Sequence, residues 1–184
     1  MTTIQAPLAT ASAHARSTKS GRGQHTLLLF HLAGQSYGIP LRDVQEVVPM
    51  ARLSHPPSMP AVLAGFLNLG GIAIPVLRLD RLFGLQEQSV GLYTPLIVLR
   101  DAESRLALMV EKVSRIVSVP ADELVPVPEN HSFNDCVEEM ATFADHVVLL
   151  LSTGRILLEK EQQCLAEFQD REQTRLREME GPMP

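Results

Sequence analysis

One stretch of the sequence has the form of a catalytic motif, Gly34-Gln35-Ser36-Tyr37-Gly38. A G-x-S-x-G run is typical of serine hydrolases, in which the serine lies on a sharp turn between a strand and a helix. The pattern means little outside that context. Here strand-like residues lie on both sides of Ala33-Gly34, which indicates a β-hairpin turn. Hydrolysis through Ser36 stays an alternative from a different functional class.

The other side chains that could do chemistry are not spaced for it. No two of the six histidines are three or four residues apart, so we expect no metal site. Cys136 and Cys164 have no histidine at ligand spacing, and we expect reduced thiols, Cys136 in a loop and Cys164 on a helix. The glycines lack the spacing of a phosphate-binding loop. We therefore predict no enzyme activity, no catalytic residue and no cofactor.

Composition narrows the classes of partner. The chain has 184 residues, of which 45% are hydrophobic and 20% are charged, enough for one substantial core or two small ones. A net charge of −5, 4% aromatic residues and no tryptophan argue against a nucleic-acid surface. No apolar run approaches the ~20 residues of a membrane helix. Residues 1–24 superficially match a transit peptide, but a disordered tail is the simpler interpretation.

The central stretch runs from Gly65 to Leu79. Two apolar runs flank Gly70-Gly71, which predicts a strand, a tight turn and a second strand. Pro75 cannot donate a backbone hydrogen bond, so one side of the second strand should lack a partner. Residues 78–84 then have helical spacing and end at a glycine. The spacing of apolar residues over 41–48 predicts a short amphipathic helix, with Leu41, Val44, Val47 and Val48 on one face.

The second half of the chain repeats the first. At one constant offset Leu27 aligns with Leu96, Val44 with Val113, Val47 with Ile116 and Val48 with Val117. With a small shift, residues 66–69 align with 140–143 and residues 74–77 with 148–151. We expect strands near 26–32, 35–40, 66–70, 72–77, 95–101, 104–110 and 146–152.

This repeat predicts the architecture. Two similar units of about five short strands suit small closed β-barrels, because closure removes exposed edges. The barrels would cover about 25–88 and 94–158, possibly exchanging strands, with a groove between them. Residues 159–180 predict a charged helix with Cys164, Leu165, Phe168, Leu176 and Met179 on one face, ended by Gly181-Pro182. That helix could be a partly docked extension or a dimerisation or partner helix.

The run from Gly65 to Leu79 closely resembles the signature of CheW-like domains, the adaptor modules that couple chemoreceptors to the histidine kinase CheA. Asp43-Val44-Gln45-Glu46-Val47 is a second landmark, and the resemblance covers roughly Gln24 to Leu165. It implies a mostly β fold of two packed SH3-like barrels in a cytoplasmic, non-enzymatic adaptor recruited to receptor arrays. The implied partners are the regulatory domain of a CheA-type kinase and the cytoplasmic tip of a methyl-accepting chemoreceptor. An adaptor of a non-flagellar pathway, for surface sensing or twitching, is the alternative.

The resemblance also implies which residues bind partners. Leu41, Val44 and Val47 would lie at the groove for the receptor's helical tip, near Val110 and Val113, although core packing is the default for such side chains. A charge at Val44 should then abolish receptor binding and leave the melting temperature nearly intact. The full set of expected partner-binding residues is Leu41, Val44, Glu46, Val47, Asn68, Gly70, Gly71, Val110 and Val113.

One position departs from the family pattern. Relatives usually carry an arginine where this chain has Gly70, while Glu46 is kept. Such an arginine could pair with Glu46 or reach a partner's carboxylate through a bidentate fork. We expect Glu46 to be exposed and free here, and the turn to gain flexibility.

Overall fold

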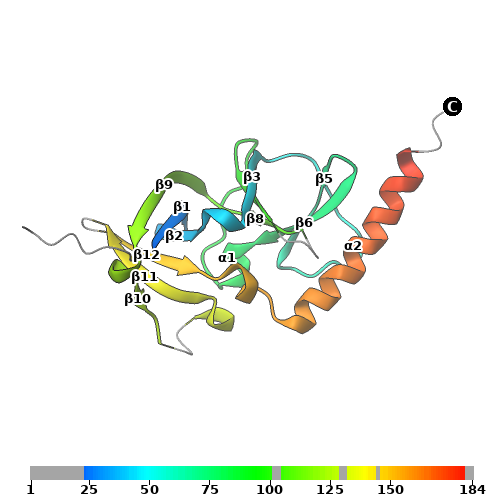
Figure 1. Cartoon of the computed structure of the whole chain (residues 1–184). Coiled ribbons are helices and arrows are strands. Elements are labelled where there is room, and N and C mark those ends of the chain that lie inside the picture. Colours follow the sequence, from blue (N-terminus) through cyan, green and yellow to red (C-terminus); the bar gives the residue numbers. More distant parts are fainter. Residues whose placement is uncertain (1–22, 101–104, 129–131, 144–145, 181–184) are drawn as a thin grey trace, which may run out of the picture.

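The computed structural model describes residues 23–100, 105–128, 132–143 and 146–180 (Figure 1). Nearly all of the expected tail at 1–24, and the expected helix end at Gly181-Pro182, fall outside these residues. The strands of the first half are β1 (Gln24–Leu32), β2 (Gln35–Pro40), β3 (Val44–Pro49), β4 (Leu53–Ser54), β5 (Leu63–Leu69) and β6 (Ile72–Arg78). Those of the second half are β7 (Pro95–Leu99), β8 (Ala107–Met109), β9 (Lys112–Pro120), β10 (Val125–Pro126), β11 (Val137–Phe143) and β12 (His146–Leu151).

The helices are short except for the last. They are α1 (Leu79–Leu82) and α2 (Glu159–Glu180), with 3-10 turns η1 (Leu41–Asp43), η2 (Ala121–Glu123), η3 (Phe133–Asp135) and η4 (Thr153–Arg155). The expected helix over residues 78–84 is confirmed as α1, and Gly84 follows it with φ +64. The left-handed conformation there favours glycine and ends the helix.

The strands form two sheets that each draw on both halves of the chain. The β2 sheet has the order β10-β11-β12-β2-β1-β9, and the β6 sheet has the order β3-β7-β8-β6-β5-β4. The hairpin β1–β2 therefore lies among strands of the second half, and the hairpin β7–β8 among strands of the first. Each sheet contains five longer strands and one of two residues, β10 or β4. Figure 1 shows the two sheets side by side, so the expected mostly β fold is confirmed.

Both sheets bury two faces, and one of those faces is shared. The largest core cluster joins Leu28 and Phe30 of β1 to Ile97 and Leu99 of β7. Each sheet packs a second, smaller cluster on its other face, around Ile74, Val76 and Val98 in the β6 sheet and around Leu27, Val148 and Leu150 in the β2 sheet. Burial on both faces explains why β6 is apolar at nearly every position, as in other doubly covered strands.

The expected amphipathic helix over 41–48 is wrong: η1 covers Leu41–Asp43 and a strand follows. The apparent helical spacing comes from a β-bulge between Val44 and Glu46. Val44, before the bulge, pairs with Leu99, and Val47, after it, pairs with Ile97. A bulge inserts one residue and shifts the alternation of side chains. Residues three apart therefore point to the same face of a strand, which the sequence pattern alone cannot tell from a helix.

The central hairpin is confirmed. Leu69 pairs with Ile72, and Gly70 and Gly71 have φ +60 and +81, as a two-residue hairpin turn with two left-handed positions requires. The parallel pairing of β6 with β8 begins at Val76, immediately after Pro75. The first half of β6 therefore has a strand partner on one side, β5, and its other side is open to α2.

Helix α2 covers that open side with side-chain amides. Gln173 Oε1 accepts a hydrogen bond from the Ala73 backbone N–H at 2.9 Å, and Gln169 Nε2 donates to the Ala73 carbonyl at 3.0 Å. Gln173 Nε2 also donates to the Gly71 carbonyl at 2.7 Å. Residues four apart share one face of a helix. Two glutamines of α2 thus supply the bonds that a neighbouring strand would give.

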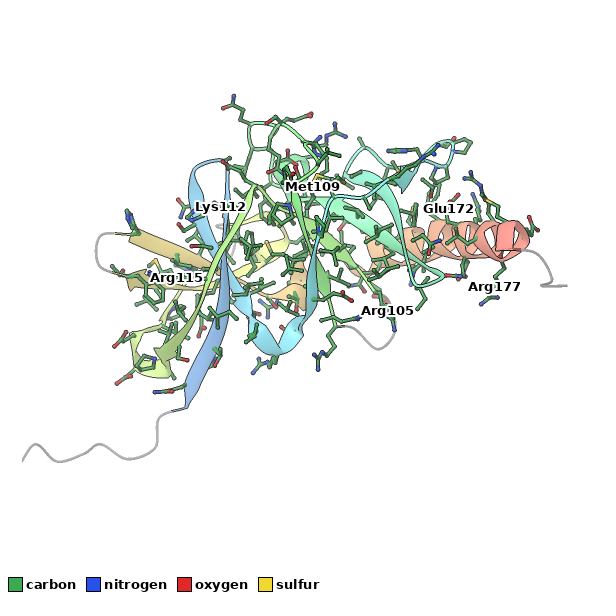
Figure 2. The ribbon with its side chains drawn as sticks, turned by 90° about the horizontal axis from the view of Figure 1, so that it is seen from above. Arg105, Met109, Lys112, Arg115, Glu172 and Arg177 are labelled. Atoms are coloured by element: carbon green, nitrogen blue, oxygen red, sulfur yellow. The ribbon has the colours of Figure 1, made fainter. Side chains whose placement is uncertain are left out.

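The face that α2 buries differs from the expected one. Leu165 is buried, and Phe168 and Leu176 pack partly against the shared core. Of the five apolar residues expected on one face, Cys164 is exposed and Met179 is 72% exposed, so only part of that face is buried. Glu172 is instead only 4% exposed, and the Ser54 hydroxyl donates to its carboxylate at 2.7 Å. Figure 2 shows Glu172 and Arg177 on different sides of α2.

Removing the amide of Gln173 should loosen α2. In Gln173→Ala the Ala73 N–H, on a residue that is 0% exposed, loses its acceptor. A buried donor without a partner costs about 1–3 kcal/mol. We expect the free energy of unfolding in urea to fall by about that amount, with faster hydrogen exchange at the Ala73 amide. Gln163→Ala, on the exposed side of the same helix, is the control. Equal losses of unfolding free energy in the two variants would contradict the stabilising role of the Gln173 hydrogen bonds.

A buried ion pair fixes the end of β6. Asp80 is 0% exposed, and its carboxylate accepts bonds from Arg78 Nε at 3.0 Å and from the backbone N–H groups of Arg81 and Gln88 at 2.9 Å each. Burial by itself raises the pKa of the Asp80 carboxyl. The hydrogen bonds, chiefly that from Arg78, outweigh burial and hold the pKa below its usual value. One carboxylate thereby joins β6, α1 and the loop after it.

The sign of this pKa change predicts sensitivity to acid. A carboxyl whose pKa is lower in the folded state stabilises the fold above the unfolded pKa of about 4, and this contribution is lost as the pH falls through the folded pKa. Asp80→Asn leaves Arg78 buried without its counter-ion and should cost about 3–5 kcal/mol at neutral pH. We expect urea unfolding across pH to give a lower and flatter curve than wild type. The exposed Asp170→Asn serves as the control, and an unchanged pH profile in Asp80→Asn would refute this role.

Candidate partner-binding site

The site begins with two strands that occupy corresponding places in the two sheets. β3 is the end strand of the β6 sheet, and β9 is the end strand of the β2 sheet. A bulge in the β1–β9 pairing lets Val113 face Phe30 and Ile116 face Leu28, three residues apart. Val44 and Val47 have the same arrangement on β3. The internal repeat therefore extends to the bulges.

In each strand one member of the pair is inner and the other is outer. Val44 is 7% exposed and belongs to the shared core, whereas Val47 is 42% exposed. Val113 is partly buried against the same core, whereas Ile116 is 56% exposed. Because their cross-strand partners all belong to the shared core, Val47 and Ile116 mark where that core reaches the surface on both sheets. Each strand therefore has one buried and one exposed apolar position; we call the exposed pair, Val47 and Ile116, the rim, and the buried apolar side chains of the shared core near these strands the floor.

The remaining floor residues lie where the chain crosses between sheets. Leu41, in η1 between β2 and β3, packs against the shared core, and Val110, between β8 and β9, is 0% exposed. A backbone hydrogen bond holds each connection. In the first, the Arg100 N–H donates to the Asp43 carbonyl at 2.7 Å, and in the second, the Glu111 N–H donates to the His31 carbonyl at 3.1 Å. The two crossings fix the position of β3 and β9 relative to the core.

The second group of expected residues surrounds the Gly70 turn. Asn68 Oδ1 accepts a hydrogen bond from the Gly71 N–H at 2.9 Å, and the Gly71 carbonyl is held by Gln173. These two bonds anchor the turn at Gly71. Glu46 is exposed as expected, but it is not free, because Gln45 Nε2 donates to its carboxylate at 3.1 Å. Glu46 lies on β3, which β7, β8 and β6 separate from β5 in the sheet order.

Ser36 lies in a β-hairpin, as expected, and not in a turn from strand to helix. It is in β2, directly opposite His31 of β1, and the Ser36 hydroxyl lies 3.2 Å from His31 Nδ1. A serine–histidine contact alone lacks the third group that orients the base in a catalytic triad. The strand–turn–helix context that gives the G-x-S-x-G motif its meaning is not present around Ser36.

The cysteines lie where the sequence indicated. Cys136 is buried between η3 and β11, where burial raises the pKa of its thiol to about 11, and Cys164 is on α2. A thiol with a raised pKa is a poor nucleophile. Within the described residues, no cluster of three His, Cys, Asp or Glu side chains could hold a metal ion. A separate search of the same residues found no helix with the length and apolarity to span a membrane.

Sequence reasoning missed two parts of the site. Ile116 was aligned with Val47 by the repeat, and that alignment was the signal that could have added it to the expected residues. Gln169 and Gln173 had no signal, because a polar helix face gives no hint of which backbone groups it will contact. The structure joins Leu41, Val44, Val110 and Val113 in one cluster, while Asn68, Gly70 and Gly71 form a separate turn.

Comparisons with known proteins bear on the family and the fold of the chain. The family model of the CheW-like domain matches residues 26–161. A chemotaxis protein CheW of Klebsiella aerogenes is 32% identical over 102 residues, 55% of this chain and 61% of that protein. One of Treponema pallidum is 26% identical over 110 residues, 58% of this chain and 65% of that protein. The chain thus spans somewhat less than two thirds of these relatives.

A solved structure has a similar fold. The crystal structure of the scaffolding protein TtCheW from Thermoanaerobacter tengcongensis aligns with a TM-score of 0.66 and 24% identity. The alignment covers 73% of this chain and 88% of that chain. At this identity the likeness concerns the fold.

The burial of Val44 changes what a mutation should do. The expectation that a charge at Val44 would leave the melting temperature intact does not fit a side chain that is 7% exposed in the core. An unpaired buried charge costs several kcal/mol, so Val44→Asp should lower the melting temperature by many degrees. Val47→Asp, at 42% exposed, should change it little. Thermal unfolding followed by circular dichroism checks this, and equal losses in both variants would show that the rim is core.

Proposed function

Because the chain belongs to the CheW-like domain family, we propose that it is a non-enzymatic adaptor that couples chemoreceptors to a CheA-type histidine kinase. An adaptor needs two binding surfaces on one rigid body and no chemistry of its own. The observation that carries the proposal is the apolar rim formed by Val47 and Ile116, which the repeat places at matching positions of the two sheets. The protein would act at the cytoplasmic face of receptor arrays.

The receptor side of the proposal rests on the rim and its floor. An amphipathic helix binds a groove by laying its apolar face against exposed apolar side chains. Val47 and Ile116 offer such side chains, and Leu41, Val44, Val110 and Val113 belong to the shared core that their strands cover. The helical tip of a chemoreceptor is the partner that we propose for this surface. Val47→Asp and Ile116→Asp should each weaken binding of a soluble receptor tip fragment, whereas Val147→Asp, 45% exposed on β12, should not.

The kinase side of the proposal rests on the Gly70 turn. We place the contact with the regulatory domain of the kinase around Asn68, Gly70 and Gly71, with Glu46 contributing from β3. An arginine at an interface contributes ~2 kcal/mol or more, and this chain has none at position 70. Weak coupling to a generic CheA-type kinase follows. The chain would therefore serve a dedicated partner or an accessory pathway, such as surface sensing or twitching.

Restoring the arginine tests the kinase contact. A Cβ at Gly70 would meet nothing within 4 Å, so the side chain has room, although φ +60 costs an L-residue about 1–2 kcal/mol of stability. We expect Gly70→Arg to tighten binding to the kinase regulatory domain by tenfold or more, as ~2 kcal/mol implies. The measurement is isothermal titration calorimetry with purified full-length protein.

Gly34→Arg is the matched control, because Gly34 also has a left-handed φ of +78 and open space around it. It carries the same charge and the same backbone cost but lies in the β1–β2 turn. Tight kinase binding by the wild type, or no gain in Gly70→Arg over Gly34→Arg, would refute the kinase contact. Failure to bind any receptor tip fragment would refute the adaptor role itself.

A further inference from the structure

A groove lies on the β6 sheet beside the Gly70 turn. It runs between the C-terminal half of α2 and the strands β4 and β5, and its volume is about 660 Å³. Residues 172, 175, 176 and 179 form its helical wall, at the spacing of one helix face. Asn68 of β5 lines it as well, so the groove adjoins the turn.

The groove carries one positive charge in excess, because two arginines and one glutamate line it and one of the arginines pairs with that glutamate. Arg52, the residue directly before β4, is exposed and lines the groove. It makes no hydrogen bond or ion pair with any residue that the structure describes. Arg175 comes from α2, and 54% of its side chain is exposed. The carboxylate in the groove, that of Glu172, is buried and already accepts bonds from Ser54 and Arg175. Two guanidinium groups therefore face solvent in a chain whose net charge is −5.

Part of the groove between these charges is apolar, next to the polar side chains of Ser54, His55 and Asn68. Phe66 of β5 is 2% exposed beneath it, Leu176 is partly buried, and Met179 is 72% exposed at its rim. Methionine is flexible and adapts to differently shaped apolar partners. Guanidinium groups bind carboxylates through two parallel hydrogen bonds. The groove thus combines anchors for carboxylates with a surface for aliphatic side chains.

We propose that this groove binds a segment of a protein partner in which acidic residues flank aliphatic ones. Arg52 and Arg175 would each take a carboxylate, and the aliphatic side chains would contact Leu176 and Met179. The charge of the groove decides between occupants, because a basic or neutral segment would leave Arg52 without a counter-ion, whereas Arg175 already pairs with Glu172. The site is distinct from the rim at Val47 and Ile116, and it does not depend on the identity of the proposed kinase or receptor.

The test uses the full-length protein, labelled with ¹⁵N, and two synthetic peptides at millimolar concentration. One is acetyl-Glu-Leu-Leu-Glu-amide, and the other is its uncharged counterpart acetyl-Gln-Leu-Leu-Gln-amide. We expect the acidic peptide to shift the amide signals of Asn68 and Ala73 and the side-chain Nε signals of Arg52 and Arg175. The neutral peptide should bind at least several-fold more weakly.

Variants separate the groove from general charge attraction. Arg52→Gln should weaken binding of the acidic peptide several-fold, whereas Arg115→Gln, on β9 away from α2 in Figure 2, should leave it unchanged. Melting temperatures of both variants, expected to match the wild type, exclude unfolding. No localised shifts, equal binding of both peptides, or equal effects of the two variants would overturn the proposal. Concentration-dependent self-association that shifts the same signals without peptide would overturn it in favour of a second copy as occupant.

Discussion

The fold depends on the hydrophobic core that the two sheets share. Each sheet contains a hairpin from the other half of the chain, so Phe30 and Ile97 meet in one cluster although they belong to different repeats. Neither half can complete its sheet alone. Separating the two halves of the chain would expose this cluster and also strip each sheet of two strands. For an adaptor this matters, because surfaces on opposite sheets are held at a fixed distance and orientation.

The same core explains how much of the site the sequence could predict. The internal repeat identified the two similar β units, and the Gly-Gly turn located the central hairpin. The spacing of Val44 and Val47 was read as helical because a β-bulge places residues three apart on one face. In the structure Val113 and Ile116 have the same spacing within the long strand β9, which the sequence pattern did not predict as a strand either. A feature that occurs in both repeats and fits a strand in one of them is better read as a bulge.

Other parts of the structure could not be predicted, because they depend on contacts between distant residues. Glu172 interrupts the apolar face of α2 in the sequence, but in the fold it is buried against Ser54, 118 residues away. Gln169 and Gln173 bond to backbone groups of β6 that are open because β8 begins opposite Val76. Sequence patterns report which side chains prefer burial. They do not report which backbone groups a sheet leaves without a partner.

The contact between α2 and the Gly70 turn links the position of the helix to the conformation of the turn. A turn of two glycines has more backbone freedom to lose than one with an arginine, which opposes order in the turn. Here the Gly71 N–H bonds to Asn68 and the Gly71 carbonyl to Gln173, so one amide of α2 fixes the turn from outside. That amide also bonds to Ala73 and thereby fixes α2 to β6. The position of the helix and the conformation of the turn are thus set by the same side chain. A partner that moves α2 would change the turn as well.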